Sequence, residues 1–143
     1  MSKLIVTGGQ KLKGEIDVEG SKNAVLPILA ASILNSDISI ITNCPKLRDV
    51  EIALEILKSI GCRVKIEENA VIIDSSSLNK TDIPVDLAAE MRSSIIFLGP
   101  MLARCRKVTI SYPGVCVVLL TVCTSYVYNI TNTQINITNN NRY

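Results

Sequence analysis

Residues 20–23 of the sequence read Gly-Ser-Lys-Asn at a predicted turn between a strand and a helix. At such a turn the ammonium of Lys22 and the amide of Asn23 lie beside the free N–H groups of the first helical turn, where an anion is stabilised. The pair therefore forms a candidate anion site. A solvated lysine that follows a glycine turn is the alternative.

Arg92 occupies the corresponding position in a second predicted helix, two residues after Glu90. A guanidinium can bind a phosphate through two parallel hydrogen bonds, which an ammonium cannot do. The alternatives are a surface arginine or an ion pair between Arg92 and Glu90.

A cysteine completes the set of reactive side chains. Residues 111–116 read Ser-Tyr-Pro-Gly-Val-Cys, which predicts a strand that ends in a Pro-Gly turn with Cys116 just beyond it. Its thiol can ionise or donate a proton where a nearby cation lowers its pKa from roughly 8.5. The alternative is an inert buried thiol, which is also what we expect of Cys44, Cys62 and Cys105.

Alternating strands and helices are expected to position these residues. Apolar periodicity and turn residues predict βαβαββ in the first part of the chain. The predicted elements are strands at 4–6 and 14–19, a helix from Ser21 to about residue 34 with a kink at Pro27, a strand at 38–42, a helix from Asp49 to Gly61, and a pair of strands at 62–66 and 71–73.

The pattern then starts again. Residues 90–103 resemble the helix that follows Gly20, and a strand at 108–111 and Pro113 follow them. Each of the two units is a helix with a cation in its first turn, then a strand, then a proline turn. The sequence thus indicates an internal repeat of one supersecondary unit.

Composition excludes several functional classes. The 143 residues carry a net charge of +2 from interspersed charges, so we expect no nucleic-acid partner. The longest apolar stretch, at 24–34, is too short to span a bilayer, and no signal peptide is evident, so no membrane contact is expected. The five cysteines lack a CxxC pair, which favours free thiols in the cytoplasm over a zinc site or disulfides.

Four ordered motifs resemble the enolpyruvyl transferase family, specifically its branch acting on UDP-N-acetylglucosamine. The resemblance extends from Leu4 to Gly114. The motifs read L-x-G-x-I-x-V-x-G-S-K-N-A-x-L-P-I-L-A-A, N-x-P-x-L-x-D-V, M-R-S-S-I-x-x-L-G-P-x-L-A-R and P-G-V-C, at residues 12–31, 43–50, 91–104 and 113–116.

The resemblance implies an α/β (α+β) fold, an inside-out α/β barrel of repeated βαβαββ units, here incomplete. It further implies three parts of the chain. Residues 1–20 form a strand segment that completes a second domain in full-length members, residues 21–116 form a partial transferase domain, and residues 117–143 form a low-complexity tail outside the family pattern.

The same resemblance implies the activity and the roles of the residues. The substrates are phosphoenolpyruvate and UDP-N-acetylglucosamine, the reaction begins peptidoglycan synthesis, and no metal or organic cofactor takes part. Lys22 binds the phosphate of phosphoenolpyruvate, Asn23 contacts the sugar nucleotide, Arg92 lies at the phosphate-binding cleft, and Cys116 donates a proton to the vinyl carbon.

Two departures from the family pattern and two alternatives qualify this interpretation. Val115 stands where the family has glycine, and residues 117–143 do not match the family's continuation, so we expect little turnover from this chain alone. The alternatives are the sister enzyme that acts on shikimate 3-phosphate, and a non-catalytic fragment that self-associates through exposed sheet edges.

Overall fold

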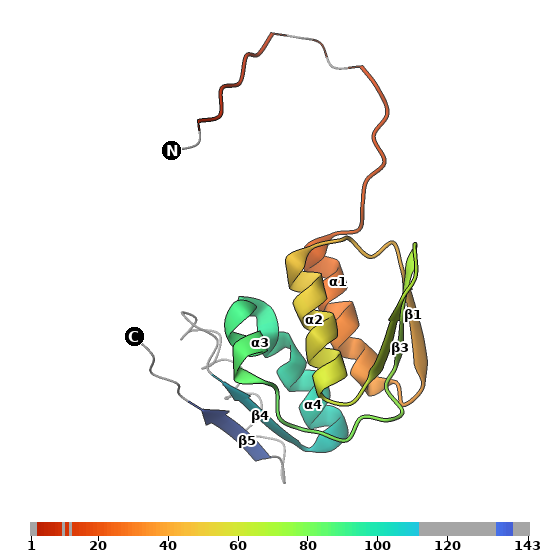
Figure 1. The fold of residues 1–143 in the computed structure, drawn as a ribbon, viewed down its shortest axis with the longest axis vertical. Helices are drawn as coiled ribbons and strands as arrows, with labels where there is room; N and C mark the ends of the chain where they lie inside the picture. Colours follow the sequence, from red (N-terminus) through yellow and green to blue (C-terminus); the bar gives the residue numbers. More distant parts are fainter. Residues whose placement is uncertain (1–2, 10, 12, 112–133, 139–143) are drawn as a thin grey trace.

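The computed structural model describes residues 3–9, 11, 13–111 and 134–138 (Figure 1). The helices occupy the middle of the molecule, with one sheet along one side and a short ladder of two strands along the other. The described elements are α1 (Lys22–Ala31), η1 (Ser32–Leu34), β1 (Ile38–Thr42), α2 (Arg48–Ser59), β2 (Arg63–Ile66), β3 (Ala70–Asp74), α3 (Val85–Glu90), η2 (Arg92–Phe97), α4 (Leu98–Cys105), β4 (Lys107–Ser111) and β5 (Gln134–Thr138).

The first repeat unit follows the sequence prediction closely from residue 21 onward. In α2 the apolar residues recur at helical spacing and are buried, while Glu51, Glu55 and Lys58 face outward. Gly61 ends this helical segment with a φ of 104°, a conformation that favours glycine. The predicted strand at 38–42 and the predicted strand pair after Gly61 are confirmed as β1, β2 and β3.

These three strands form an antiparallel sheet in the order β1-β3-β2, in which Ile40 and Lys65 lie opposite Ile72 on its two sides. The inner face of the sheet contributes Val71 and Ile73 to the core, where they meet the apolar side of the helices. The strand β1 lies at one edge of the sheet in the described part of the chain.

The prediction of strands at 4–6 and 14–19 is wrong. Residues 3–9 and 13–19 have no assigned strand, run apart from the folded body, and expose Leu4 and Val18 to 90% and 85% (Figure 1). Alternation of apolar and charged residues indicates which face of a strand would be buried, but a strand also needs a neighbouring edge. No described element supplies one, so the observed order in the first unit is αβαββ.

The second repeat unit has a different helical segment from the one predicted. Residue Met91 adopts extended backbone, with φ −115° and ψ 105°, so α3 ends at Glu90 and a new helical segment, η2, begins at Arg92 and continues into α4. The predicted cation in the first turn is therefore confirmed, although the helix predicted to begin at residue 90 is split at Met91. The predicted strand at 108–111 is confirmed as β4, and Pro113 lies outside the described residues.

Residues 134–138 form a strand within the segment that the sequence indicates as a low-complexity tail. The strand β5 pairs with β4 in parallel, with Lys107 opposite Gln134 and Ser111 opposite Thr138. Alternating isoleucine and polar residues have the period of a strand, which explains why a segment of simple composition can add to a sheet.

An arginine of the second repeat unit, Arg104, contacts the first unit at two places. The guanidinium of Arg104, on α4, donates hydrogen bonds to the carbonyl oxygen of Ile33 at 2.6 Å and to the hydroxyl and carbonyl oxygens of Ser75 at 2.9 and 2.7 Å. It thereby satisfies backbone acceptors after α1 and after β3 at once. The ends of three elements are fixed relative to one another by this contact.

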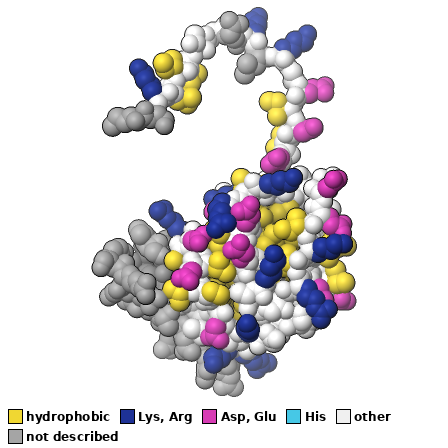
Figure 2. Space-filling model, viewed as in Figure 1, with side chains coloured by type: hydrophobic (Ala, Val, Ile, Leu, Met, Phe, Trp, Pro, Cys, Tyr) yellow, Lys and Arg dark blue, Asp and Glu magenta, His cyan; other side chains and the backbone are white. Residues whose placement is uncertain are grey.

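Charges of both signs are interspersed over the face of the molecule seen in Figure 2, with no block of one sign. Within the described residues, every helix is too short or too polar to cross a membrane. The cysteines Cys44, Cys62 and Cys105 are free thiols, as the sequence predicts.

Candidate substrate-binding site

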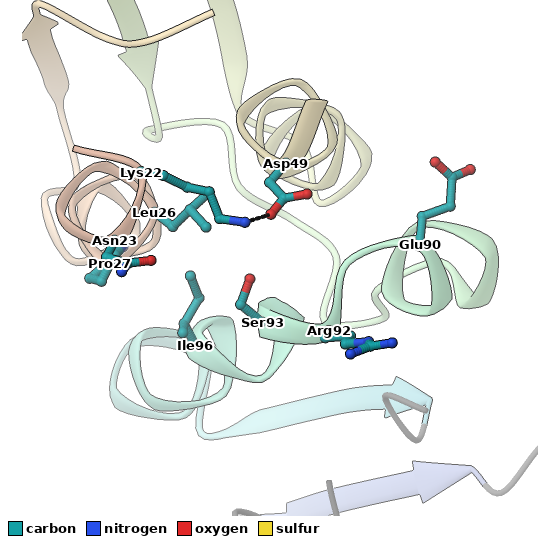
Figure 3. A pocket seen from close by; sticks show the side chains of 9 residues that line it. All are labelled: Lys22, Asn23, Leu26, Pro27, Asp49, Glu90, Arg92, Ser93 and Ile96. Atoms are coloured by element: carbon teal, nitrogen blue, oxygen red, sulfur yellow. Dashed lines mark ion pairs between the residues drawn. The ribbon is translucent and has the colours of Figure 1, made fainter. Parts of the chain in front are cut away.

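The residues predicted to bind an anion meet in one hollow between the two repeat units. The hollow has a volume of about 480 Å³. It receives side chains from α1, α2, α3 and η2 (Figure 3). Its lining consists of Lys22, Asn23, Leu26, Pro27, Asp49, Glu90, Arg92, Ser93 and Ile96. Arg92, which is far from Lys22 and Asn23 in the sequence, therefore lines the same hollow as that pair.

Gly20 allows the first two sequence motifs to pack against each other. A side chain at this position would collide with the carbonyl oxygen of Asn43, which lies in the turn before α2. The backbone of Ser21 is extended, and its carbonyl oxygen accepts a hydrogen bond from the N–H of Val25 at 2.9 Å. The start of α1 is thus fixed beside the start of α2, with Lys22 directed toward α2.

Lys22 forms an ion pair inside the hollow. Its ammonium lies 2.5 Å from the carboxylate of Asp49, in the first turn of α2. A carboxylate near a helix N-terminus is stabilised by the helix dipole. The side chains of Lys22 and Asp49 are 50% and 30% exposed, so both remain accessible from the hollow.

The sequence interpretation did not single out Asp49 or Ser93. Asp49 is the aspartate of the second motif, so its place in that motif was the available signal. Ser93 is the counterpart of Asn23 in the repeat, and Figure 3 shows its hydroxyl pointing toward the space beside Lys22. Aligning the two repeat units would have found it.

Arg92 lines the hollow at the start of η2 and is exposed. The predicted alternative, in which Glu90 pairs with Arg92, is wrong because Glu90 accepts a hydrogen bond from Arg48 at 2.8 Å. The extended backbone of Met91 separates Glu90, the last residue of α3, from Arg92, the first residue of η2. Glu90 therefore joins α3 to α2 across the edge of the hollow.

Positive and negative side chains are equal in number in the lining of the hollow. Two cations, Lys22 and Arg92, and two carboxylates, Asp49 and Glu90, line it. An ammonium and a guanidinium can together donate hydrogen bonds to the oxygens of one phosphate. The remaining lining residues are the polar Asn23 and Ser93 and the apolar Leu26, Pro27 and Ile96.

Cys116 lies outside the described residues. Among the described cysteines, burial raises the pKa of the Cys62 thiol to about 11, and it also raises the pKa of Cys44 and of Cys105. A raised pKa keeps a thiol protonated and unreactive near neutral pH. This finding agrees with the prediction that these three cysteines are inert.

Comparison with known proteins identifies the family. A family model described as EPSP synthase (3-phosphoshikimate 1-carboxyvinyltransferase) matches residues 6–120. The chain therefore belongs to the EPSP synthase family of enolpyruvyl transferases, and the resemblance inferred from the four motifs is confirmed. Its fold is an incomplete α/β version of the enolpyruvyl transferase fold.

Two relatives and one solved structure refine the comparison. The chain is 46% identical over 116 residues to UDP-N-acetylglucosamine 1-carboxyvinyltransferase 2 of Caldanaerobacter subterraneus subsp. tengcongensis, covering 81% of the chain and 28% of the relative. It is 45% identical over 118 residues to UDP-N-acetylglucosamine 1-carboxyvinyltransferase of Trichlorobacter lovleyi, covering 82% and 28%. The chain thus spans little more than a quarter of the length of these relatives.

The solved structure is that of the enolpyruvyl transferase NikO from Streptomyces tendae. It superposes with a TM-score of 0.60 at 24% identity, over 68% of this chain and 23% of that one. At this identity the likeness supports the fold alone.

Proposed function

We propose that this chain is part of an enzyme that transfers the enolpyruvyl group from phosphoenolpyruvate to UDP-N-acetylglucosamine and releases phosphate. The observation that carries the proposal is the common hollow lined by Lys22 and Arg92. Two cations beside a partly apolar wall suit a small substrate with a dianionic phosphate. The names of the relatives at 45–46% identity support the choice of acceptor.

The proposed roles follow the chemistry of the reaction. Lys22 and Arg92 bind the phosphate of phosphoenolpyruvate, and Asn23 contacts the sugar nucleotide. Cys116 donates a proton to the terminal vinyl carbon while the sugar hydroxyl, losing its own proton to a base, forms a bond to the neighbouring carbon. Loss of a proton from the methyl group then restores the double bond as phosphate leaves with the electrons of the broken carbon–oxygen bond.

The chain spans little more than a quarter of the length of its relatives, and this bears on the activity expected of the chain alone. The proposal is that the described residues bind phosphoenolpyruvate but support little turnover. A coupled phosphate-release assay with both substrates checks this. Release at a rate near that of an ordinary enzyme, on the order of 10 per second, would contradict the expected low turnover.

The sister activity toward shikimate 3-phosphate is the alternative, and the description of the family model names that substrate class. A competition experiment separates the two. With phosphoenolpyruvate present, UDP-N-acetylglucosamine should change the NMR chemical shifts of Asn23 and Ser93. Shikimate 3-phosphate should leave them unchanged. The reverse result would assign the chain to the sister activity, and no shift with either would support a non-catalytic fragment.

Two further parts of the proposal concern the setting of the enzyme. We place the reaction in the cytoplasm as the first committed step of peptidoglycan synthesis, which links it to cell-wall biogenesis, cell shape and division. We also propose that residues 1–20 complete a second domain of the full-length enzyme. Support for this comes from the extended segments at 3–9 and 13–19, whose apolar residues, including Ile5 and Ile16, are exposed to 74% and 89%.

A further inference from the structure

The two cations of the hollow differ in how the carboxylates near them are engaged. Lys22 is paired directly with Asp49. Glu90, the acidic residue closest to Arg92 in the sequence, is paired instead with Arg48, whose guanidinium donates a hydrogen bond to its carboxylate at 2.8 Å. Among the residues that the structure describes, no carboxylate forms an ion pair with Arg92.

Without that partner, Glu90 lies close enough in the chain to reach Arg92. Met91 alone separates the two residues, so their Cα atoms are within about 7 Å of each other. Both side chains line the hollow, and Figure 3 shows the carboxylate of Glu90 directed away from Arg92. An arginine binds a carboxylate through the same fork of N–H groups that it presents to a phosphate. The Glu90 carboxylate is therefore a built-in competitor for the phosphate.

The positions of Arg48 and Glu90 favour their pairing with each other. Arg48 is the first residue of α2, where the helix dipole disfavours a cation, and Glu90 is the last residue of α3, where the dipole disfavours an anion. Each charge offsets the unfavourable position of the other. Glu51, one turn further along α2, accepts a second hydrogen bond from the guanidinium at 3.3 Å and holds it at this end of the helix.

The internal repeat shows that this carboxylate is particular to the second unit. When Lys22 is aligned with Arg92, Gly20 falls at the position of Glu90. Gly20 carries no charge, so no side chain at that position competes for Lys22. Of the two units, the second alone has an acidic residue two positions before its cation, and the residue that neutralises it, Arg48, comes from α2 of the first unit.

We propose that Arg48 is a positioning residue for phosphate binding, an inference that rests on the proposed function of the hollow. Arg48 binds the carboxylate of Glu90 and so keeps the guanidinium of Arg92 available for the phosphate of phosphoenolpyruvate. It is not among the described residues that line the hollow, so it acts through Glu90 and Arg92. The side chains of Arg48 and Glu90 are 61% and 49% exposed, so loss of the pair should release the carboxylate without unfolding the chain.

The affinity of the full chain for phosphoenolpyruvate, measured by isothermal titration calorimetry at constant ionic strength, tests this role. Arg48→Gln releases Glu90 and should weaken binding about fivefold, the size expected for an exposed charge pair. Adding Glu90→Gln to that variant should restore the parent affinity. The matched control adds Glu51→Gln instead, which removes the same charge outside the hollow and should not restore it. Circular dichroism checks that each variant folds.

A measurement without ligand separates a failure of this proposal from a failure of the proposed function. Glu90→Gln should leave the side-chain Nε–H resonance of Arg92 unchanged in the parent chain, where Arg48 holds the carboxylate. The same substitution should move that resonance in the Arg48→Gln chain, where Glu90 is free to bind Arg92. A parent chain that does not bind phosphoenolpyruvate would refute the proposed function, and the resonance of Arg92 would then decide the role of Arg48.

Three results would overturn the proposal. In the first, Glu90→Gln alone weakens binding as much as Arg48→Gln does, as expected if the pair merely joins α2 to α3. In the second, Glu51→Gln restores the affinity of the Arg48→Gln chain as well as Glu90→Gln does, as expected if net charge alone matters. In the third, the resonance of Arg92 is insensitive to Glu90→Gln in both chains, so that Glu90 never reaches Arg92.

Discussion

The ammonium of Lys22 lies 2.5 Å from the carboxylate of Asp49 on the wall of a hollow that Arg92 also lines. The two residues lie in the first turns of different helices, and the turn that packs against Gly20 brings those helices together. The pair keeps the lysine extended into the hollow without a ligand. It also places a negative charge where a phosphate is expected to bind.

The Asp49 carboxylate should therefore weaken anion binding. Asp49→Asn removes one of the two carboxylates that line the hollow with two cations, so the lining gains a net positive charge. We expect the affinity for phosphoenolpyruvate to rise several-fold at low salt, with a smaller gain at high salt because of screening. Isothermal titration calorimetry measures this. The control is Glu67→Gln, which breaks the exposed ion pair with Lys65 away from the hollow and should leave the affinity unchanged. A loss of affinity in Asp49→Asn would contradict the prediction.

Substitution by alanine should change the stability of the fold in opposite directions at Gly61 and at Gly99. At Gly61 the φ of 104° and the nearby carbonyl oxygen of Ser77 leave no comfortable place for a side chain, so Gly61→Ala should destabilise the fold by about 1–2 kcal/mol. At Gly99, inside α4, an added Cβ meets no atom within 4 Å. Gly99→Ala should stabilise it by about 0.5–1 kcal/mol. Urea unfolding measures both, and equal effects would refute the argument.

Arg104 should contribute strongly to stability through the backbone acceptors that it satisfies. Arg104→Ala leaves the carbonyl oxygens of Ile33 and Ser75 without this donor, at an expected cost of about 2–4 kcal/mol. Arg104→Lys should recover only part of this, because one ammonium cannot reproduce the planar fork. Lys107→Ala, at an exposed residue, is the control and should change the unfolding free energy by less than about 0.5 kcal/mol.

Cys62 should make the fold sensitive to alkaline pH. Burial raises the pKa of its thiol from 9.0 to about 11 in the folded chain. Below pH 9 the thiol is protonated in both states and has no effect. Between pH 9 and 11 the unfolded chain loses the proton more readily, so stability falls, by an amount on the order of 2 kcal/mol at pH 11.

The variant Cys62→Ala provides the comparison for this pH dependence. Other groups that titrate above pH 9 are common to both chains, so the difference between the two unfolding curves isolates Cys62. We expect the parent to lose more stability than Cys62→Ala as the pH rises through this range. Parallel curves would show that the thiol ionises equally well in the folded and unfolded states.

The sequence alone was sufficient to predict an element where the local apolar pattern and the tertiary packing favour the same structure. The helix α2 shows this, because its apolar spacing and Gly61 determine both its buried face and its end. Prediction failed where the outcome depends on a distant neighbour. The alternation at 14–19 is that of a strand, yet no described edge pairs with it.

The site was partly predictable for the same reason. Lys22 and Arg92 could be identified because each follows a recognisable start of a repeat unit, and aligning the repeats relates them. The partners of charged residues could not be identified. Glu90 pairs with Arg48 rather than Arg92 because Met91 interrupts the helix, and neither propensity nor spacing reveals that break.

The joint binding of a phosphate by Lys22 and Arg92 is tested most directly by a double-mutant cycle on the affinity for phosphoenolpyruvate. Lys22→Gln and Arg92→Gln should each weaken binding by roughly 10- to 100-fold, as expected for charge-assisted hydrogen bonds. The double variant should lose less than the sum of the two free-energy changes, because both side chains contact one phosphate. Lys65→Gln, an exposed lysine outside the hollow, should have no effect. Unchanged affinity in either single variant, or strictly additive losses, would contradict the common site.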